Sequence, residues 1–275
     1  MLNDLLSLKH FNRIKFHDKT HTYFVDGKVV PISVTKLIEH HKPSFNSDYF
    51  AGKKAKELGC SKEDILHIWK GSNFYSTQLG SYFHSYVENY FQNKIKPFPF
   101  DYPQISKLLD EGQKTDLVKN CKDNVAKFDR FIAEHGHLLP IRSELVVGDL
   151  DTGLICGMMD LLVYDEKIEG YAIYDYKTNK RFSYSSRFNK KFCKPLSDIE
   201  CCEFNDYSIQ LSLYKIFIER YTSLKIKEMN ILWFHNSNEE CQLIKCADMT
   251  EAALRMLDNV PKIVADLASN TELEK

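Results

Sequence analysis

Four residues in one stretch of the chain are of types that can bind a metal ion and act on a phosphate. They are Glu144, Asp160, Asp175 and Lys177, each inside or beside a short apolar run. Asp175 and Lys177 are two residues apart, so on a strand both side chains point to the same face of a sheet. A carboxylate and an ammonium group on one strand face are a poor choice for a core. Their placement indicates that something charged binds between them.

The residue types favour Mg²⁺ or Mn²⁺ together with a phosphate. Magnesium binds oxygen ligands, retains several waters, and is usually held by one or two carboxylates together with a substrate phosphate. A bound divalent metal polarises the phosphoryl oxygen and lowers the pKa of a bound water. A neighbouring lysine can stabilise the negative charge of the transition state. The alternative is an ordinary surface hairpin in which Asp175 and Lys177 form an ion pair, because this three-residue pattern is common.

Three strands are needed to bring these four residues to one edge of a sheet. Apolar, β-branched and aromatic residues predict strands over 144–147, 154–164 and 171–176. Gly153 and the segment 165–170 supply the turns between them. We therefore expect the four side chains to meet at the tips of these strands.

A helix upstream carries a histidine beside a mid-helix glycine, although a lone histidine on a helix is usually structural. Apolar residues recur every four positions over 77–93 and predict a helix with a buried stripe. Gly80, His84 and Glu88 are also four apart and share the adjacent helix face. A glycine in mid-helix costs about 1 kcal/mol relative to alanine, so Gly80 indicates close approach by a backbone or a substrate. Glu88 can act as a partner that fixes the tautomer of the imidazole.

The order and spacing of these residues resemble a known nuclease core. Gly157-Met158-Met159-Asp160 and Asp175-Tyr176-Lys177 resemble the G-x-x-D and D/E-x-K patterns of the RecB-like branch of the PD-(D/E)XK nuclease superfamily. The segment from Gly80 to His84 is similar to its G-x-x-x-H pattern, and Gln210 to Tyr214 to its Q-x-x-x-Y pattern. The segments YFVDG (23–27) and PISVT (31–35) resemble the N-terminal entry of viral and mitochondrial exonucleases of this branch.

The resemblance implies an α/β fold with a restriction-endonuclease-like central mixed β-sheet flanked by helices, preceded by an N-terminal hairpin and a helical region. It covers about residues 23 to 214, and we expect residues 1–275 to form one nuclease domain. Residues 1–136 form the hairpin and helical part that carries His84. Residues 137–275 form the core sheet, a flap and the C-terminal helices.

The resemblance also implies a role for each site residue. The catalytic set is Asp160, Asp175, Lys177 and Glu144. The metal ligands, for Mg²⁺ or Mn²⁺, are the side chains of His84, Asp160 and Asp175 and the carbonyl of Tyr176. Gln210 and Tyr214 position the substrate.

The segment that follows Lys177 is typical of a single-strand binder. Residues 178–194, which we call the flap, hold no acidic residue and interleave aromatic with cationic side chains. Cations for phosphates and aromatic faces for bases are what such a binder needs. The flap residues predicted to contact DNA are Lys180, Arg181, Arg187, Lys190 and Lys191. The alternative is a plain solvated loop.

Composition adds constraints on partners and location. The formal net charge is -1, so any charge that binds nucleic acid must be local. The 8 cysteines contain no C-x-x-C pair, and the spacing of the iron–sulfur cluster found in some RecB-like proteins is missing, so we expect reduced thiols. No stretch approaches the length of a transmembrane helix, which predicts a cytoplasmic protein, in the host cytoplasm if the chain is viral.

The function expected from the sequence is a metal-dependent DNA nuclease. An exonuclease acting on DNA ends or single strands, in replication, recombination or repair, is favoured. Three alternatives stay open: a non-catalytic DNA-binding or virion-associated module with a nuclease fold, a site-specific endonuclease, and an unrelated protein that carries the patterns by chance.

Overall fold

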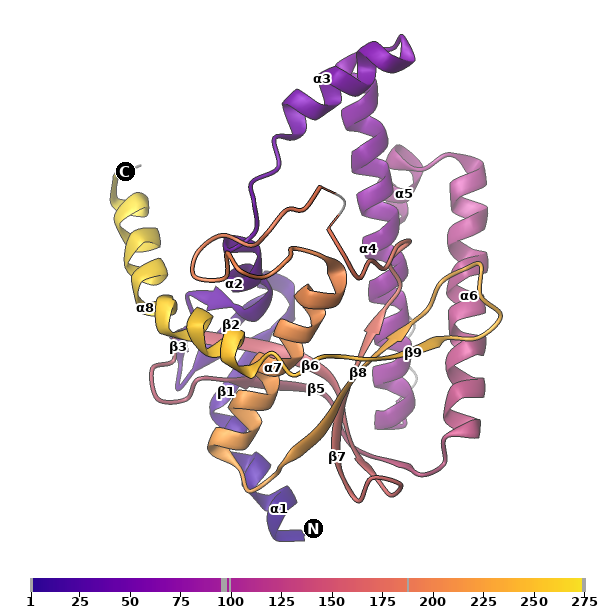
Figure 1. Ribbon diagram of the computed structural model, residues 1–275. Helices are drawn as coiled ribbons and strands as arrows, with labels where there is room; N and C mark the ends of the chain where they lie inside the picture. Colours follow the sequence, from indigo (N-terminus) through magenta and orange to yellow (C-terminus); the bar gives the residue numbers. More distant parts are fainter. Residues whose placement is uncertain (1, 95–97, 99, 187, 274–275) are drawn as a thin grey trace.

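A mixed six-stranded sheet forms the centre of the molecule (Figure 1). The computed structural model describes residues 2–94, 98, 100–186 and 188–273. The strands of this sheet are β4 (Ile32–Ser33), β5 (Leu138–Gly148), β6 (Ile155–Asp165), β7 (Gly170–Lys177), β8 (Ile226–Trp233) and β9 (Gln242–Lys245). The α-helices are α1 (Leu2–Ser7), α2 (Val34–His40), α3 (Ser47–Leu58), α4 (Lys62–Gln92), α5 (Tyr102–Leu108), α6 (Glu111–Glu134), α7 (Glu203–Tyr221) and α8 (Thr250–Leu273).

Strand β6 has two different neighbours along one of its edges. Its other edge pairs antiparallel with β5 along nearly its full length. On the first edge, β4 pairs in parallel with Ile155 and Cys156, and β7 pairs antiparallel with residues 161–165. Among the described residues, positions 157–160 of β6 therefore have a strand partner on the β5 side alone. Asp160 lies where β7 leaves β6 and continues along β8.

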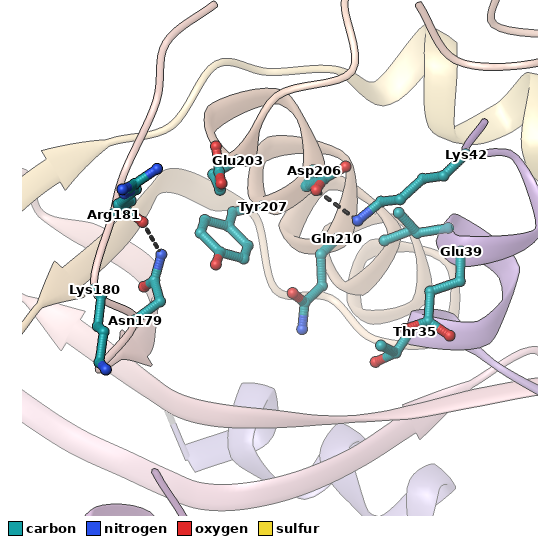
Figure 2. Close-up of a pocket in the computed structure, with 11 residues that line it drawn as sticks. Thr35, Glu39, Lys42, Asn179, Lys180, Arg181, Glu203, Asp206, Tyr207 and Gln210 are labelled. Carbon is teal, nitrogen blue, oxygen red and sulfur yellow. Dashed lines mark hydrogen bonds and ion pairs between the residues drawn. The ribbon is translucent and has the colours of Figure 1, made fainter. Parts of the chain in front are cut away.

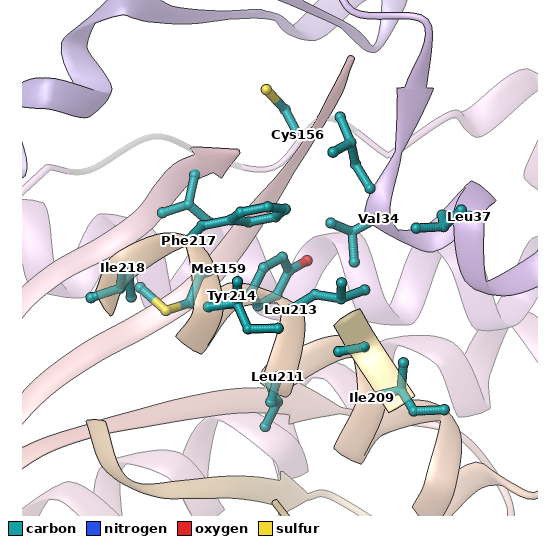
Figure 3. Close-up of a cluster of buried hydrophobic side chains, with 14 of the residues drawn as sticks. Val34, Leu37, Cys156, Met159, Ile209, Leu211, Leu213, Tyr214, Phe217 and Ile218 are labelled. Carbon is teal, nitrogen blue, oxygen red and sulfur yellow. The ribbon is translucent and has the colours of Figure 1, made fainter. Parts of the chain in front are cut away.

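Two apolar layers cover the faces of the sheet. On one face, α7 buries Ile209, Leu213 and Phe217, and α2 adds Val34 and Leu37 (Figure 3). Val34 and Leu37 belong to residues 1–136 and the α7 residues to residues 137–275, so these two parts of the chain share one core.

Helices α4 and α6 cover the opposite face. Phe83 and Phe128 pack there around Tyr176, with ring centroids about 6 Å apart. Because side chains alternate along a strand, the burial of Tyr176 on this face directs Asp175 and Lys177 to the α7 face. The shared orientation of these two residues that the sequence predicts is thus present.

Helix α4 is longer than the sequence analysis expects. The helix predicted over 77–93 is the second half of one element of 31 residues that begins at Lys62. Ser61 and Asp64 form a capping box at its start, and no proline interrupts it. Gly71 lies within it, where an added Cβ would come within 2.7 Å of the Leu108 carbonyl oxygen. The glycine here accommodates the end of α5.

The N-terminal hairpin is a three-stranded sheet instead. Its elements, after the 3₁₀ helix η1 (Leu8–Arg13), are β1 (Ile14–His17), η2 (Asp18–Thr20), β2 (Thr22–Val25) and β3 (Lys28–Val29). The Asp26-Gly27 pair, at φ of 49° and 82°, turns β2 into β3 rather than β1 into β2. Two consecutive positive φ angles are typical of the tight turn that such a pair favours.

Ser33 and Asn205 are of types that favour N-cap positions, but only one of them caps a helix. Ser33 caps α2, with its hydroxyl accepting a hydrogen bond from the amide of Lys36 at 3.2 Å. Asn205 lies inside α7, which starts after Cys202, and donates its side-chain amide to the carbonyl of Glu200. Within the described residues, no helix combines the length and apolarity needed to cross a membrane.

We expect Gly157→Ala to lower the free energy of unfolding by about 1–3 kcal/mol, because overpacking a filled core costs this much. An added Cβ would lie 2.8 Å from Cε1 of Tyr214 and 3.0 Å from Cβ of Val34. Urea unfolding followed by circular dichroism measures the change. As a control, Gly52→Ala in α3, whose Cβ would meet nothing closer than Lys62 at 4.0 Å, should raise stability by roughly 0.5–1 kcal/mol. A Gly157→Ala protein as stable as wild type would contradict this packing.

Candidate metal centre

Three side chains from three separate elements converge at the point where β6 and β7 separate. His84 comes from α4, Glu144 from β5 and Asp160 from β6. One donor atom of each lies within 4.8 Å of the others. His84 Nδ1 is 3.5 Å from Asp160 Oδ1 and 3.6 Å from Glu144 Oε1. The structure therefore brings together three residues that are widely separated in the sequence, in an arrangement that can hold a cation.

The backbone of Glu144 adopts a left-handed conformation inside a strand, with φ of 49°. The five other described non-glycine residues with such a φ lie in turns or loops. The β5–β6 register places Glu144 opposite Asp160, between the pairs Ser143–Leu161 and Leu145–Met159. Left-handed φ costs energy in a non-glycine residue and is kept at sites where geometry matters for function. Nothing in the sequence around Glu144 predicts this conformation.

Asp175 and Lys177 form a second group beside the three donors. The side chain of Asp175 is 1% exposed, and its carboxylate is ion-paired with Lys177 Nζ. Lys177 Nζ also lies over the ring of Tyr207 in α7, 4.8 Å from its centroid. The sequence analysis makes Asp175 a metal ligand with His84 and Asp160. The structure pairs it with Lys177, and Glu144 is the third member of the donor group.

The backbone of Tyr176 ties these two groups together. Its amide donates a 2.7 Å hydrogen bond to Asp160 Oδ2. The amide and carbonyl of one strand residue point to the same neighbouring strand, so the carbonyl of Tyr176 also faces β6. This orientation is the one that the predicted role of the carbonyl as a ligand requires.

Burial and neighbouring charges shift the pKa values of the centre. Burial raises the pKa of Asp160, and it raises that of Asp175 to about 6, with the charge of Asp160 adding to the effect. Burial lowers the pKa of His84, but the Asp160 and Glu144 carboxylates more than offset this and raise it to about 9. At neutral pH the metal-free imidazole is therefore protonated and serves as a counter-ion to the carboxylates.

The donor set fits a divalent metal ion. Carboxylates and carbonyls suit Mg²⁺ and Mn²⁺, and imidazole is a better ligand for transition metals. A site with one imidazole nitrogen and two carboxylates therefore favours Mn²⁺ over Mg²⁺. Both ions leave further positions for water and for substrate oxygens.

Three other predicted site residues differ in their surroundings. Gln210 Nε2 donates to the hydroxyl of Tyr214 at 3.1 Å, but Tyr214 is 2% exposed and packs against Gly157. Tyr214 thus contacts Gln210 from within the core, and its role in positioning the substrate stays a prediction. Glu88 accepts a hydrogen bond from Gln92. Among the described residues its partner is therefore Gln92 and not the imidazole of His84, with which the sequence analysis pairs it.

A pocket of about 480 Å³ adjoins the centre between α2, α7 and the start of the flap (Figure 2). Its wall is formed by Thr35, Ile38, Glu39, Lys42, Asn179, Lys180, Arg181, Glu203, Asp206, Tyr207 and Gln210. Tyr207 connects the pocket to the centre because Lys177 lies over its ring.

Sequence reasoning missed most of the wall that α7 contributes. Glu203, Asp206, Tyr207 and Gln210 follow the spacing of one helix face. Because the sequence analysis already names Gln210, this spacing could have predicted that Glu203, Asp206 and Tyr207 lie on the same side of the helix. Lys42, which pairs with Asp206 at 2.6 Å, comes from a distant segment and gave no comparable signal.

The flap divides into two parts. Lys180 and Arg181 line the pocket, and Lys180 Nζ lies 5.3 Å from the ring centroid of Tyr75. Lys190 and Lys191 are exposed, and Lys191 forms an isolated β-bridge with Glu200. Arg187, which is predicted to contact DNA, lies outside the described residues.

Comparison with known proteins gives no family. No family model matches the chain, and no curated protein matches it. Among solved structures, the crystal structure of SSO0001 is similar, with a TM-score of 0.36 and 10% sequence identity over 96% of this chain and 87% of that chain. A likeness at this level assigns neither a fold family nor a function.

We expect the affinity for Mn²⁺ to rise as the pH rises from 6 towards 9. Metal ligands must be deprotonated, and the pKa of His84 is raised to about 9, so metal and proton compete for the imidazole. Titration calorimetry in two buffers of different ionisation enthalpy should show about one proton released at pH 7.5 in the wild type. His84→Gln should lower the affinity and abolish the release, whereas His137→Gln, in the turn before β5 and away from the centre, should change neither. Affinity that is constant over this pH range would contradict the assignment.

Proposed function

We propose that this chain is a metal-dependent DNA nuclease with a restriction-endonuclease-like core of the RecB-like type. The observation that carries the proposal is the meeting of His84, Glu144 and Asp160 beside the buried Asp175–Lys177 pair. Mixed carboxylate and imidazole donors next to a lysine are suited to phosphodiester hydrolysis. The favoured activity is exonucleolytic, on DNA ends or single strands.

In this proposal the three donors hold a metal ion that, when bound, polarises a phosphoryl oxygen and lowers the pKa of a water. The role of Lys177 follows from its surroundings. Burial lowers the pKa of Lys177, but the Asp175 and Asp160 carboxylates more than offset this and raise it above the ordinary value. The side chain therefore stays charged at neutral pH. It acts as a hydrogen-bond donor that orients the water or stabilises charge on the phosphate, and not as the group that removes a proton.

The pocket beside the centre is suited to the strand that is being cut. Lys180 and Arg181 provide cations for the phosphates. Gln210 and the ring of Tyr207 provide an amide and an aromatic face for a nucleotide. The pocket also carries Glu39, Glu203 and Asp206, which repel phosphates and so confine the backbone to the flap side.

We expect Asp160→Asn to abolish metal-dependent cleavage of labelled single-stranded DNA. An asparagine oxygen can still accept the hydrogen bond of the Tyr176 amide, so the protein should fold. Lys177→Ala should lower kcat about 10²–10³-fold, the usual cost of removing one group that stabilises transition-state charge. Asp165→Asn, at the far end of the same strand, should remain active.

Undiminished cleavage by Asp160→Asn or Lys177→Ala would refute the roles assigned to these residues. A wild-type protein that binds DNA but cleaves nothing with either Mg²⁺ or Mn²⁺ would favour the non-catalytic DNA-binding alternative.

We also expect the protein to degrade linear DNA and to leave covalently closed circular DNA intact, because an exonuclease needs a free end. Gel analysis of linear and closed circular forms of one sequence, under the same metal conditions, measures the difference. Linearisation of the closed circle would show an endonuclease instead.

A further inference from the structure

A helical arm projects from the molecule (Figure 1). It consists of the segment from Phe45, α3 and the beginning of α4, and the two helices pack against each other around Ala51, Ala55 and Ile65. The arm carries exposed aromatic rings. We call its four contiguous rings the arm cluster: Phe45, Tyr49, Phe50 and Trp69. Phe45 and Phe50 are stacked, with centroids 5.0 Å apart and planes 4° from parallel. Trp69 lies 6.0 Å from Phe45, and Tyr49 lies 5.2 Å from Phe50.

Three of the four rings of the arm cluster are largely exposed to water, and Trp69 is partly buried against the arm. Phe45 is 61% exposed, Tyr49 64% and Phe50 40%. The buried residues of the arm are two alanines and an isoleucine, so these three rings contribute little to the core of the arm. A contiguous exposed apolar patch of this kind marks a binding surface.

The charges around the arm cluster indicate what binds there. Residues 42–70 hold six lysines and four acidic residues. Lys54 and Lys62 are paired with Glu57 and Asp48. Lys53, Lys56 and Lys70 are exposed and form no ion pair with any residue that the structure describes. Tyr49, Lys53 and Lys56 share one face of α3, so free cations lie beside an exposed ring.

A short segment of chain connects the arm cluster to the pocket beside the metal centre. Lys42 lines that pocket, and the chain reaches Phe45 three residues later. On the other side, Trp69 and His84 are on the same helix, 15 residues apart. At 1.5 Å per residue, this places them about 22 Å apart along the axis of α4. A strand that leaves the pocket therefore has a short path to the rings.

We propose that the arm cluster binds single-stranded DNA, with bases stacked on its rings and phosphates beside Lys53, Lys56 and Lys70. Stacking platforms combined with cations are how proteins hold single strands without regard to sequence. Lysine is depleted in the cores of protein–protein interfaces, so its presence among the rings favours nucleic acid over a protein partner. The assignment rests on the proposed nuclease function, because it treats the bound strand as the substrate.

The test is equilibrium binding of fluorescent oligo(dT) to the full chain in EDTA, where no cleavage occurs. The double variant Phe45→Leu/Phe50→Leu keeps apolar side chains and removes two rings. It should weaken binding at least about tenfold, because each stacked base contributes strongly. Leu58→Ala, an exposed apolar residue on the same arm but outside the arm cluster, should bind as wild type. Lys53→Gln/Lys56→Gln should reduce the salt slope of log K by about 1.4, the value for two phosphate contacts on a single strand.

A second measurement does not depend on the folding of the ring variant. In Trp233→Phe protein the remaining tryptophan is Trp69, and oligo(dT) should quench its emission through stacking. Unquenched emission, or unchanged affinity of the ring variant, would overturn the proposal. Light scattering offers another outcome that would overturn the proposal: an oligomeric wild type and a monomeric ring variant with unchanged DNA affinity. The rings would then form a protein interface. Failure of the proposed nuclease function would give a different result. The arm would still bind oligo(dT), but the protein would cleave no DNA with any metal.

Discussion

The site depends on the separation of β7 from β6. Where the two strands part, the amide of Tyr176 loses its strand partner on that side, and Asp160 accepts its hydrogen bond instead. Asp160 and Asp175 are thereby held as buried carboxylates, and buried charges are costly unless they are compensated. His84 and Lys177 provide compensation from α4 and from β7 itself. The architecture of the sheet thus creates both the gap and the need for positive charge within it.

A divalent cation would balance the charges of the centre. Glu144, Asp160 and Asp175 carry three negative charges when ionised, and Lys177 carries one positive charge. When the imidazole of His84 is neutral, two negative charges remain, which is the charge that a divalent metal offsets. In the absence of metal, the raised pKa of His84 allows a proton to offset part of this charge. The same carboxylates therefore attract a proton or a metal, and the two compete.

Much of this arrangement could be predicted from the sequence. The alternation of Asp175, Tyr176 and Lys177, and the helix face that presents His84, follow from the fixed periods of strands and helices. The spacing of Gln210 and Tyr214 predicts that the two side chains share one helix face, but it does not predict whether either is exposed. Tyr214 is buried because its ring packs against Gly157, which belongs to a different pattern in the sequence. That contact also gives a physical reason why a glycine stands three residues before Asp160.

Other features could not be predicted because they depend on tertiary packing. The left-handed backbone of Glu144 is a property of one residue held by its neighbours, and the surrounding sequence is that of an ordinary strand. The length of α4 does not follow from its apolar stripe, because the stripe over 77–93 covers only the second half of the helix. The pocket wall on α7 faces α2 and the residues just after it, more than 160 positions earlier in the chain, as the Lys42–Asp206 pair shows.

The most direct test of the central claim is a crystal structure of the protein grown with Mn²⁺, with anomalous diffraction used to locate the ion. The account predicts an anomalous peak bonded to a His84 ring nitrogen and to carboxylate oxygens of Glu144 and Asp160. Saturating Mn²⁺ with no peak among these three side chains would contradict it.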